Sequence, residues 1–185
     1  MNKQKIFSYA NCISYTRIVL LLASVLQSQN NWFFPLYAAS YILDAFDGYV
    51  ARLMNETSQF GAVMDMVTDR VSTAVLLSLL QKPYWLCIMI LDISSHWVYT
   101  HSLEKTQSHK KSKNKFLSWY YEPVNLFLVC FFTELYCFLN LMCERNSFWQ
   151  PIQSVYIFSG CVFGIKQILN GIHLYLGLKT LLYKY

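Results

Sequence analysis

Residues 44–69 read DAFDGYVARLMNETSQFGAVMDMVTD and set four aspartates among apolar side chains. Asp44 and Asp47 are separated by three positions, and two small residues follow them in the same segment. Asp65 and Asp69 are separated by four positions. Because side chains three and four positions apart lie on one face of an α-helix, each pair occupies a single stripe of its own helix. A short reversal between the two helices then brings the pairs face to face.

The composition of the whole chain is that of a membrane protein. Of its 185 residues 55% are hydrophobic, 17% are aromatic and only 14% are charged, which lies outside the range of soluble domains. A disordered chain needs low hydrophobicity and high charge, and a secreted disulfide scaffold needs paired cysteines in a short chain. The six cysteines are scattered through apolar runs without CxxC spacing, which is typical of small buried hydrophobic residues.

The apolar runs predict six membrane-spanning helices. A hydrocarbon core about 30 Å thick needs about 20 mostly apolar residues per helix. The six segments are expected at 10–28, 32–52, 60–81, 84–103, 122–143 and 154–180. Ionisable side chains inside such segments normally face the interior of a helix bundle. We therefore expect an all-α integral membrane protein, a single domain over residues 1–185, with six transmembrane helices around a polar cavity that faces the cytoplasm.

The basic residues predict the orientation of the chain. With six spans, both termini and the second and fourth loops share one side of the membrane, and ten of the fifteen Lys and Arg residues fall there. Only Lys82 and Arg145 fall on the other side. Since positive charge is retained on the cytoplasmic side, both termini are expected in the cytoplasm.

The four aspartates predict a divalent metal site. Carboxylates gathered in a low-dielectric cleft repel one another unless a cation lies between them. Carboxylate oxygens select Mg²⁺ or Mn²⁺ over zinc or copper, and four carboxylates favour two ions. Small residues beside them would let the helices approach closely and leave room for a phosphate ligand. The alternative is a packed bundle in which basic side chains pair with the aspartates; its candidates are Arg17, Arg52, Arg70 and Lys166.

The pattern D-x2-D-G-x2-A-R-x8-G-x3-D-x3-D, complete from Asp44 to Asp69, resembles the signature of the CDP-alcohol phosphatidyltransferase family. The resemblance extends from about Asn11 through the fifth expected helix. It implies a six-helix membrane enzyme that uses two divalent cations to transfer a phosphatidyl or phosphoalcohol group from a CDP-linked donor and releases CMP. The strings LDAFDGYVAR, FGAVMDMVTDR and LDISSHWVYTH are similar to the eukaryotic branch of the family that uses inositol.

That similarity implies substrates and a location. The donor would be CDP-diacylglycerol, the acceptor myo-inositol, and the products phosphatidylinositol and CMP. Eukaryotic relatives imply the membrane of the endoplasmic reticulum or the Golgi, and the family commonly forms homodimers. No nucleic acid partner is expected. The resemblance also makes Asp44, Asp47 and Asp65 metal ligands and makes Asp69 the general base, which also touches a metal.

Further residues are expected to bind the two substrates. Gly48 would let the backbone approach the nucleotide, Arg52 offers a guanidinium fork to the pyrophosphate, and Ser58 offers a hydroxyl. For the neutral, hydroxyl-rich acceptor, the side chains at i, i+3 and i+4 of the fourth expected helix form a hydrogen-bonding group, and these are Asp92, Ser95 and His96. A histidine in an apolar helix is also commonly a structural group, and that alternative stays open.

Two other functions compete with this one. Another enzyme of the same family would use glycerol phosphate, serine or an amino-alcohol, and a phosphorylated acceptor would call for several basic residues near the metals. A divalent-cation transporter could also hold buried carboxylates, but transport would need polar residues along both halves of the membrane path.

Overall fold

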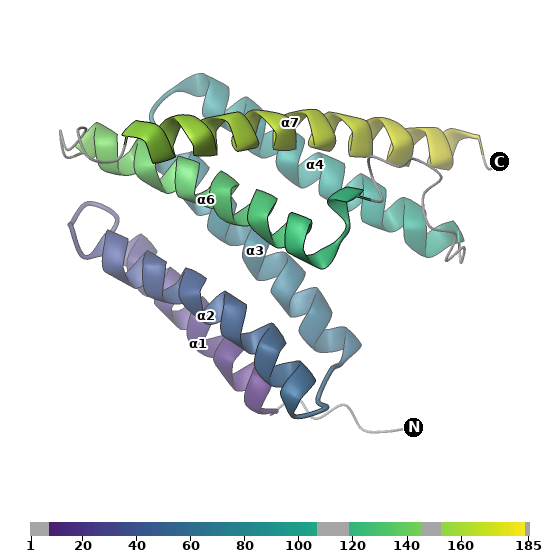
Figure 1. Cartoon of the computed structure of the whole chain (residues 1–185), viewed down its shortest axis with the longest axis horizontal. Helices are drawn as coiled ribbons and strands as arrows, with labels where there is room; N and C mark the ends of the chain where they lie inside the picture. The colour runs from purple at the N-terminus through teal and green to yellow at the C-terminus, as the bar shows by residue number, and fades with distance from the viewer. Residues whose placement is uncertain (1–7, 107–118, 146–152, 184–185) are drawn as a thin grey trace. The chain divides into compact units, whose positions relative to one another are not determined.

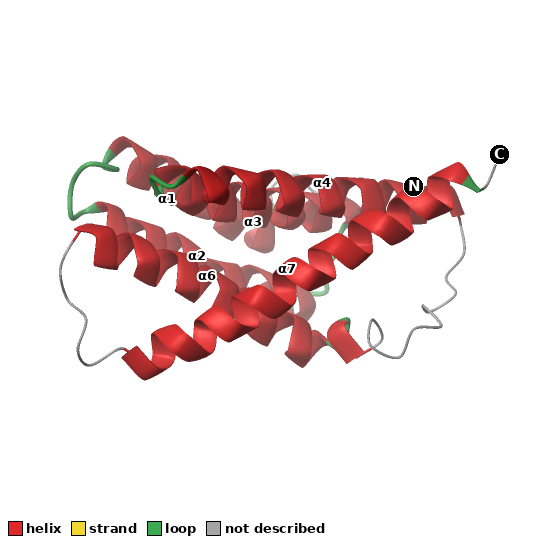
Figure 2. Cartoon of the chain, turned by 90° about the horizontal axis from the view of Figure 1, so that it is seen from above, coloured by secondary structure: helices red, strands yellow, loops and turns green. Residues whose placement is uncertain are grey.

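The computed structural model describes residues 8–106, 119–145 and 153–183. In these residues every regular element is an α-helix (Figure 2). The helices are α1 (Tyr9–Leu26), α2 (Phe33–Leu53), α3 (Gln59–Leu79), α4 (Pro83–Thr106), α6 (Pro123–Arg145) and α7 (Gln153–Leu182) (Figure 1). Each expected helical segment coincides with one of them to within a few residues. The prediction of an all-α chain is therefore confirmed over the described ranges.

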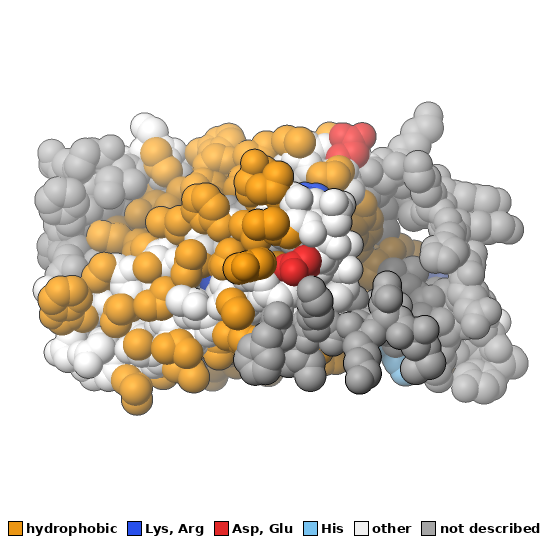
Figure 3. Space-filling view, turned by 90° about the horizontal axis from the view of Figure 1, so that it is seen from below, with side chains coloured by type: hydrophobic (Ala, Val, Ile, Leu, Met, Phe, Trp, Pro, Cys, Tyr) orange, Lys and Arg blue, Asp and Glu red, His pale blue; other side chains and the backbone are white. Residues whose placement is uncertain are grey.

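Three of the helices, α1, α6 and α7, are long and apolar enough to cross a membrane. Helices α2 and α3 carry the aspartates of the signature, and α4 carries Asp92. Apolar side chains cover much of the described surface on the face that Figure 3 shows. Leu26, Ile90 and Ile168 are each more than half exposed. An apolar surface of this extent is what a lipid environment covers. The structure thus supports an integral membrane protein, while the count of six spans stays a prediction.

The chain divides into two compact units, and the boundary between Val75 and Leu76 falls inside α3. In the first unit α1 and α2 lie side by side (Figure 1). Ser40 of α2 donates a hydrogen bond of 2.9 Å to the backbone carbonyl of Arg17 on α1. This contact requires the two backbones to approach closely, since a serine side chain is short. It sets Arg17 against the helix that carries the first two aspartates.

The turn between α2 and α3 is a Schellman motif. Asn55 has a positive φ of 52°, the left-handed conformation that ends many helices. The N–H of Glu56 donates to the carbonyl of Ala51 at 2.9 Å, and the N–H of Asn55 donates to the carbonyl of Arg52 at 3.3 Å. These two bonds satisfy carbonyls that the end of α2 would leave without partners. The reversal expected between the two aspartate pairs is confirmed.

This turn is also bonded to the start of α1. The carboxylate of Glu56 accepts a hydrogen bond of 3.0 Å from the backbone N–H of Tyr9. A carboxylate at a helix N-terminus is favourable because the first N–H groups have no partner within the helix. The start of α1, the end of α2 and the start of α3 are therefore linked in the first unit.

In the second unit α7 packs against both α4 and α6. The approach to α4 is closest at Gly177, where an added Cβ would lie 2.9 Å from Val98 Cγ1 and 3.1 Å from the backbone nitrogen of Tyr99. Glycine is therefore needed there for steric reasons. Beside α6, the rings of Tyr136 and Phe163 lie 4.9 Å apart between centroids.

Candidate active site

Arg17 of α1 lies among the four aspartates of the signature, and its side chain is only 2% exposed. Its Nη1 lies 3.1 Å from Asp47 Oδ2 and 3.0 Å from Asp65 Oδ1, and it is also paired with Asp44 Oδ1. Its Nη2 lies 2.9 Å from Asp69 Oδ1. One guanidinium therefore joins carboxylates from α2 and α3, and the predicted convergence of the two pairs is found in the structure.

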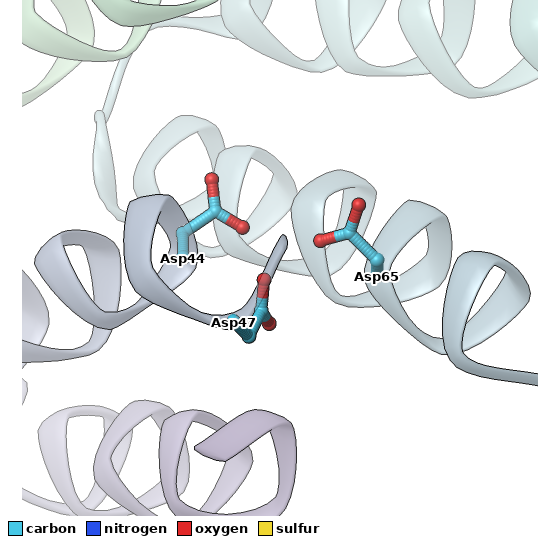
Figure 4. A group of neighbouring side chains, drawn as sticks. All are labelled: Asp44, Asp47 and Asp65. Carbon is cyan, nitrogen blue, oxygen red and sulfur yellow. The ribbon is translucent and has the colours of Figure 1, made fainter. Parts of the chain in front are cut away.

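Three of these carboxylates could also hold a metal ion. Asp44, Asp47 and Asp65 each offer an oxygen, and these oxygens all lie within 4.8 Å of one another. Figure 4 shows the first two on α2 and the third on α3, with the carboxylates of Asp44 and Asp65 turned toward each other. The donor set is entirely carboxylate oxygen, the set that Mg²⁺ and Mn²⁺ prefer. Since four carboxylates face the single charge of Arg17, the cluster retains negative charge that further cations would offset.

The aspartates differ in exposure. Asp47 is 6% exposed, and the hydroxyl of Ser14 donates to its Oδ2 at 3.0 Å. Asp69 and Asp65 are 36% and 48% exposed. The deeply placed Asp47 is thus fixed by two donors from α1, while the carboxylates of α3 remain open to a ligand.

Two residues expected to bind the donor lie next to each other on α2. An added Cβ on Gly48 would lie 3.6 Å from Arg52 Nη1, so the guanidinium lies over the glycine. Ser58 caps α3, because its Oγ accepts the N–H of Gly61 at 3.0 Å. A Cβ at Gly61 would lie 3.2 Å from that oxygen and 3.3 Å from Asn11 Oδ1. Gly61 therefore permits a close contact with Asn11 of α1, whereas a Cβ at Gly48 would make only an ordinary van der Waals contact.

The residues expected to bind the acceptor lie in the second unit. Asp92 is buried, and its Oδ1 accepts a hydrogen bond of 2.9 Å from Asn170 of α7. Lys166 Nζ lies 3.6 Å from the same oxygen. Ser95 is buried and donates to the backbone carbonyl of Asp92 at 3.0 Å, and His96 is partly buried. Lys166 thus pairs with Asp92.

Two further residues contact the carboxylates directly, Arg17 and Ser14. From the sequence, Arg17 was expected only as one of four basic residues that could pair with the aspartates in a packed bundle, and Ser14 was not expected in the site. A signal was present in α1, because Asn11, Ser14 and Arg17 are spaced by three positions and fall on one helix face. The structure buries all three. Polar residues repeated along one face of an apolar helix predict contact with other polar groups, although they do not identify the partner.

Comparisons with known proteins identify the family of the chain. A family model described as CDP-alcohol phosphatidyltransferase matches residues 7–176. The CDP-diacylglycerol–inositol 3-phosphatidyltransferase of Candida albicans is 37% identical, over 92% of this chain and 80% of that protein. The protein of the same name in Saccharomyces cerevisiae is 38% identical, over 89% of this chain and 81% of its own length. The protein of that name in Homo sapiens is 38% identical, over 76% of this chain and 74% of its own.

No solved structure matches the chain significantly. The family match covers nearly the whole chain, including α1 with Arg17 and both helices that carry the aspartates. This chain belongs to the CDP-alcohol phosphatidyltransferase family.

Proposed function

We propose that this protein is a membrane enzyme that transfers the phosphatidyl group of CDP-diacylglycerol to myo-inositol, giving phosphatidylinositol and CMP. The observation that carries the proposal is the convergence of four signature carboxylates from α2 and α3 within reach of one guanidinium. It is supported by relatives that bear the name of this activity and align with most of the chain.

The aspartates have two roles in this reaction. Asp44, Asp47 and Asp65 are metal ligands, and Asp69 is the general base, which also touches a metal. Two divalent ions, Mg²⁺ or Mn²⁺, would act as Lewis acids on the pyrophosphate and the departing CMP. Asp47 is held rigidly by Ser14 and Arg17, as a residue that fixes geometry should be.

Asp69 is exposed enough to meet the acceptor. An inositol hydroxyl oxygen attacks the phosphorus that carries diacylglycerol, the bond from that phosphorus to the CMP oxygen breaks, and the hydroxyl proton passes to Asp69. Oδ1 of Asp69 accepts a hydrogen bond of 2.9 Å from Arg17 Nη2. Positioning and charge stabilisation supply most of the rate in such transfers.

Gly48, Arg52 and Ser58 bind the donor. Arg52 is exposed above Gly48, and its fork suits a pyrophosphate. Ser58 uses its oxygen to accept the N–H of Gly61, so its hydroxyl hydrogen remains available to a phosphate oxygen.

Asp92, Ser95 and His96 are assigned to the acceptor. Inositol is neutral, so hydrogen-bonding groups suffice to bind it, and a cluster of arginines is not required. Asp92 is held by Asn170 and Lys166, which fixes the orientation of its carboxylate.

The membrane arrangement is part of the same proposal. Six helices span the bilayer around a cavity open to the cytoplasm, both termini are cytoplasmic, and the protein acts as a homodimer in the endoplasmic reticulum or the Golgi. The excess of basic residues in the cytoplasmic loops supports this orientation.

The test is a transfer assay with purified protein, CDP-diacylglycerol, Mn²⁺ and separate labelled alcohols. We expect label from inositol in phosphatidylinositol, with one CMP released per lipid formed, and no turnover after chelation of the metal. Asp69→Asn is the matched inactive control. Incorporation of glycerol phosphate or serine in place of inositol would assign another acceptor, and Mn²⁺ uptake into vesicles without any transfer would indicate a transporter.

A further inference from the structure

The side chain of Arg17 is buried, and yet it is not fully satisfied where it lies. Its Nη1 and Nη2 contact the aspartate oxygens, whereas its buried Nε has no hydrogen-bond partner in the described part of the chain. A buried donor without a partner is energetically unfavourable. A position in which Nε also met an oxygen would therefore be favoured.

Arg17 also contacts the oxygens that a metal would need. Asp47 Oδ2 and Asp65 Oδ1 lie 3.1 and 3.0 Å from Nη1. A divalent ion such as Mg²⁺ binds carboxylate oxygens at about 2.1 Å. An ion bound to these atoms would lie next to a charged guanidinium in a site of low dielectric, where like charges repel strongly. The two cations therefore compete for the same oxygens.

A guanidinium is well suited to move from carboxylates to a phosphate. Its planar fork matches both groups, and its charge is permanent. The donor of the proposed reaction carries a pyrophosphate, which would lie beside these carboxylates. A shift of the guanidinium toward a phosphate oxygen would give Nε the acceptor it lacks and remove the charge from the metal ligands.

We propose that Arg17 is an exchangeable counter-cation of the active site: it neutralises the aspartates in competition with divalent ions and binds the donor phosphate once ions hold the carboxylates. This inference rests on the proposed function for the identity of the donor. It makes Arg17 both an inhibitor of metal binding and a ligand of CDP-diacylglycerol.

The test compares Mn²⁺ and donor affinity in the purified full-length protein. Calorimetry after chelation and dialysis gives the Kd for Mn²⁺ alone, and a second titration at saturating Mn²⁺ gives the Kd for CDP-diacylglycerol. For Arg17→Gln we expect Mn²⁺ binding to tighten about tenfold and donor binding to weaken about tenfold, the scale of one hydrogen bond to a charged group. A residue that merely supports the fold would weaken both.

Arg52→Gln is the matched control, because it removes an exposed arginine from α2. It should weaken donor binding and leave the Kd for Mn²⁺ unchanged. Arg17→Lys keeps the positive charge and removes the planar guanidinium, so it replaces Arg17→Gln if that variant does not fold. Its affinity for the donor should fall. Its affinity for Mn²⁺ should rise by a smaller factor than in Arg17→Gln.

Weaker or unchanged Mn²⁺ binding in the variants of Arg17 would overturn the competition, and unchanged donor affinity would overturn the transfer to phosphate. Neither titration contains inositol. A failure of inositol incorporation with both titrations as expected would therefore reject the proposed acceptor and leave the role of Arg17 intact.

Discussion

Lys166 Nζ lies 3.6 Å from Asp92 Oδ1, and the two side chains are 3% and 5% exposed. The pair joins α7 to α4, and Asn170 adds a hydrogen bond from the next turn of α7. Bringing two charges out of water is costly, but removing one partner alone costs more because the other stays buried without compensation.

Lys166→Met should therefore destabilise the protein by about 3–5 kcal/mol. Adding Asp92→Asn should recover much of this loss, because neither charge then remains. The free energy of unfolding of both variants is measured in detergent with increasing fractions of SDS. Lys179→Met, on the exposed part of the same helix, is the control and should change stability little. A double variant as unstable as the single one would show that the ion pair does not account for the loss.

Gly177→Ala should also destabilise the second unit. The new methyl would meet Val98 and the backbone of Tyr99 at 2.9–3.1 Å, and backbone atoms cannot move aside as a flexible side chain would. The expected loss is about 1–3 kcal/mol. Gly164→Ala is the matched control on the same helix, since its Cβ would meet nothing within 4 Å. The same unfolding assay compares the stability of the two variants. Equal stability would contradict the close packing of α7 on α4.

Asp47→Asn and Asp69→Asn should have different effects on the reaction. Asp47→Asn should weaken binding of Mn²⁺ and CDP-diacylglycerol as well as turnover, since it removes a ligand. Asp69→Asn should retain much of the donor affinity while turnover falls by about 10² to 10⁴, the usual contribution of general acid–base catalysis. Calorimetric titration beside inositol incorporation separates the two. Equal loss of donor affinity in both would make Asp69 only a fourth metal ligand.

Asn55 should carry no glycan in a eukaryotic host. The chain contains a single N-x-S/T sequon, Asn55-Glu56-Thr57, and the proposed orientation puts it in the cytoplasm, away from the glycosylation machinery. Glycosidase treatment followed by mass analysis tests this. Asn55→Gly is the control, since glycine keeps the left-handed turn. A glycosidase-sensitive mass present in the natural protein and absent from this variant would reverse the orientation.

The sequence predicted those features of the site that depend on local spacing. Asp44 with Asp47 and Asp65 with Asp69 share helix faces by their separation alone, and the turn between the helices followed from the short polar segment. The sequence named Arg17 as one of four basic residues that could pair with these aspartates. It could not single out Arg17, because a helix face specifies which side chains are buried and not which helix covers them. The contact of Asp92 with Lys166 could not be predicted for the same reason, because it is made between two helices, α4 and α7.

The hydrogen bond from Tyr9 N–H to the carboxylate of Glu56 has a practical consequence for anyone who prepares this protein. It joins the first residue of α1 to the turn that separates the two aspartate pairs, so the start of α1 is linked to the segment between the two helices that carry the aspartates. A fusion partner placed directly before Ser8, or a truncation that removes Tyr9, would disturb this hydrogen bond. Activity would then change although no active-site residue had been altered. Shortening the chain at this end is therefore a change to the enzyme itself.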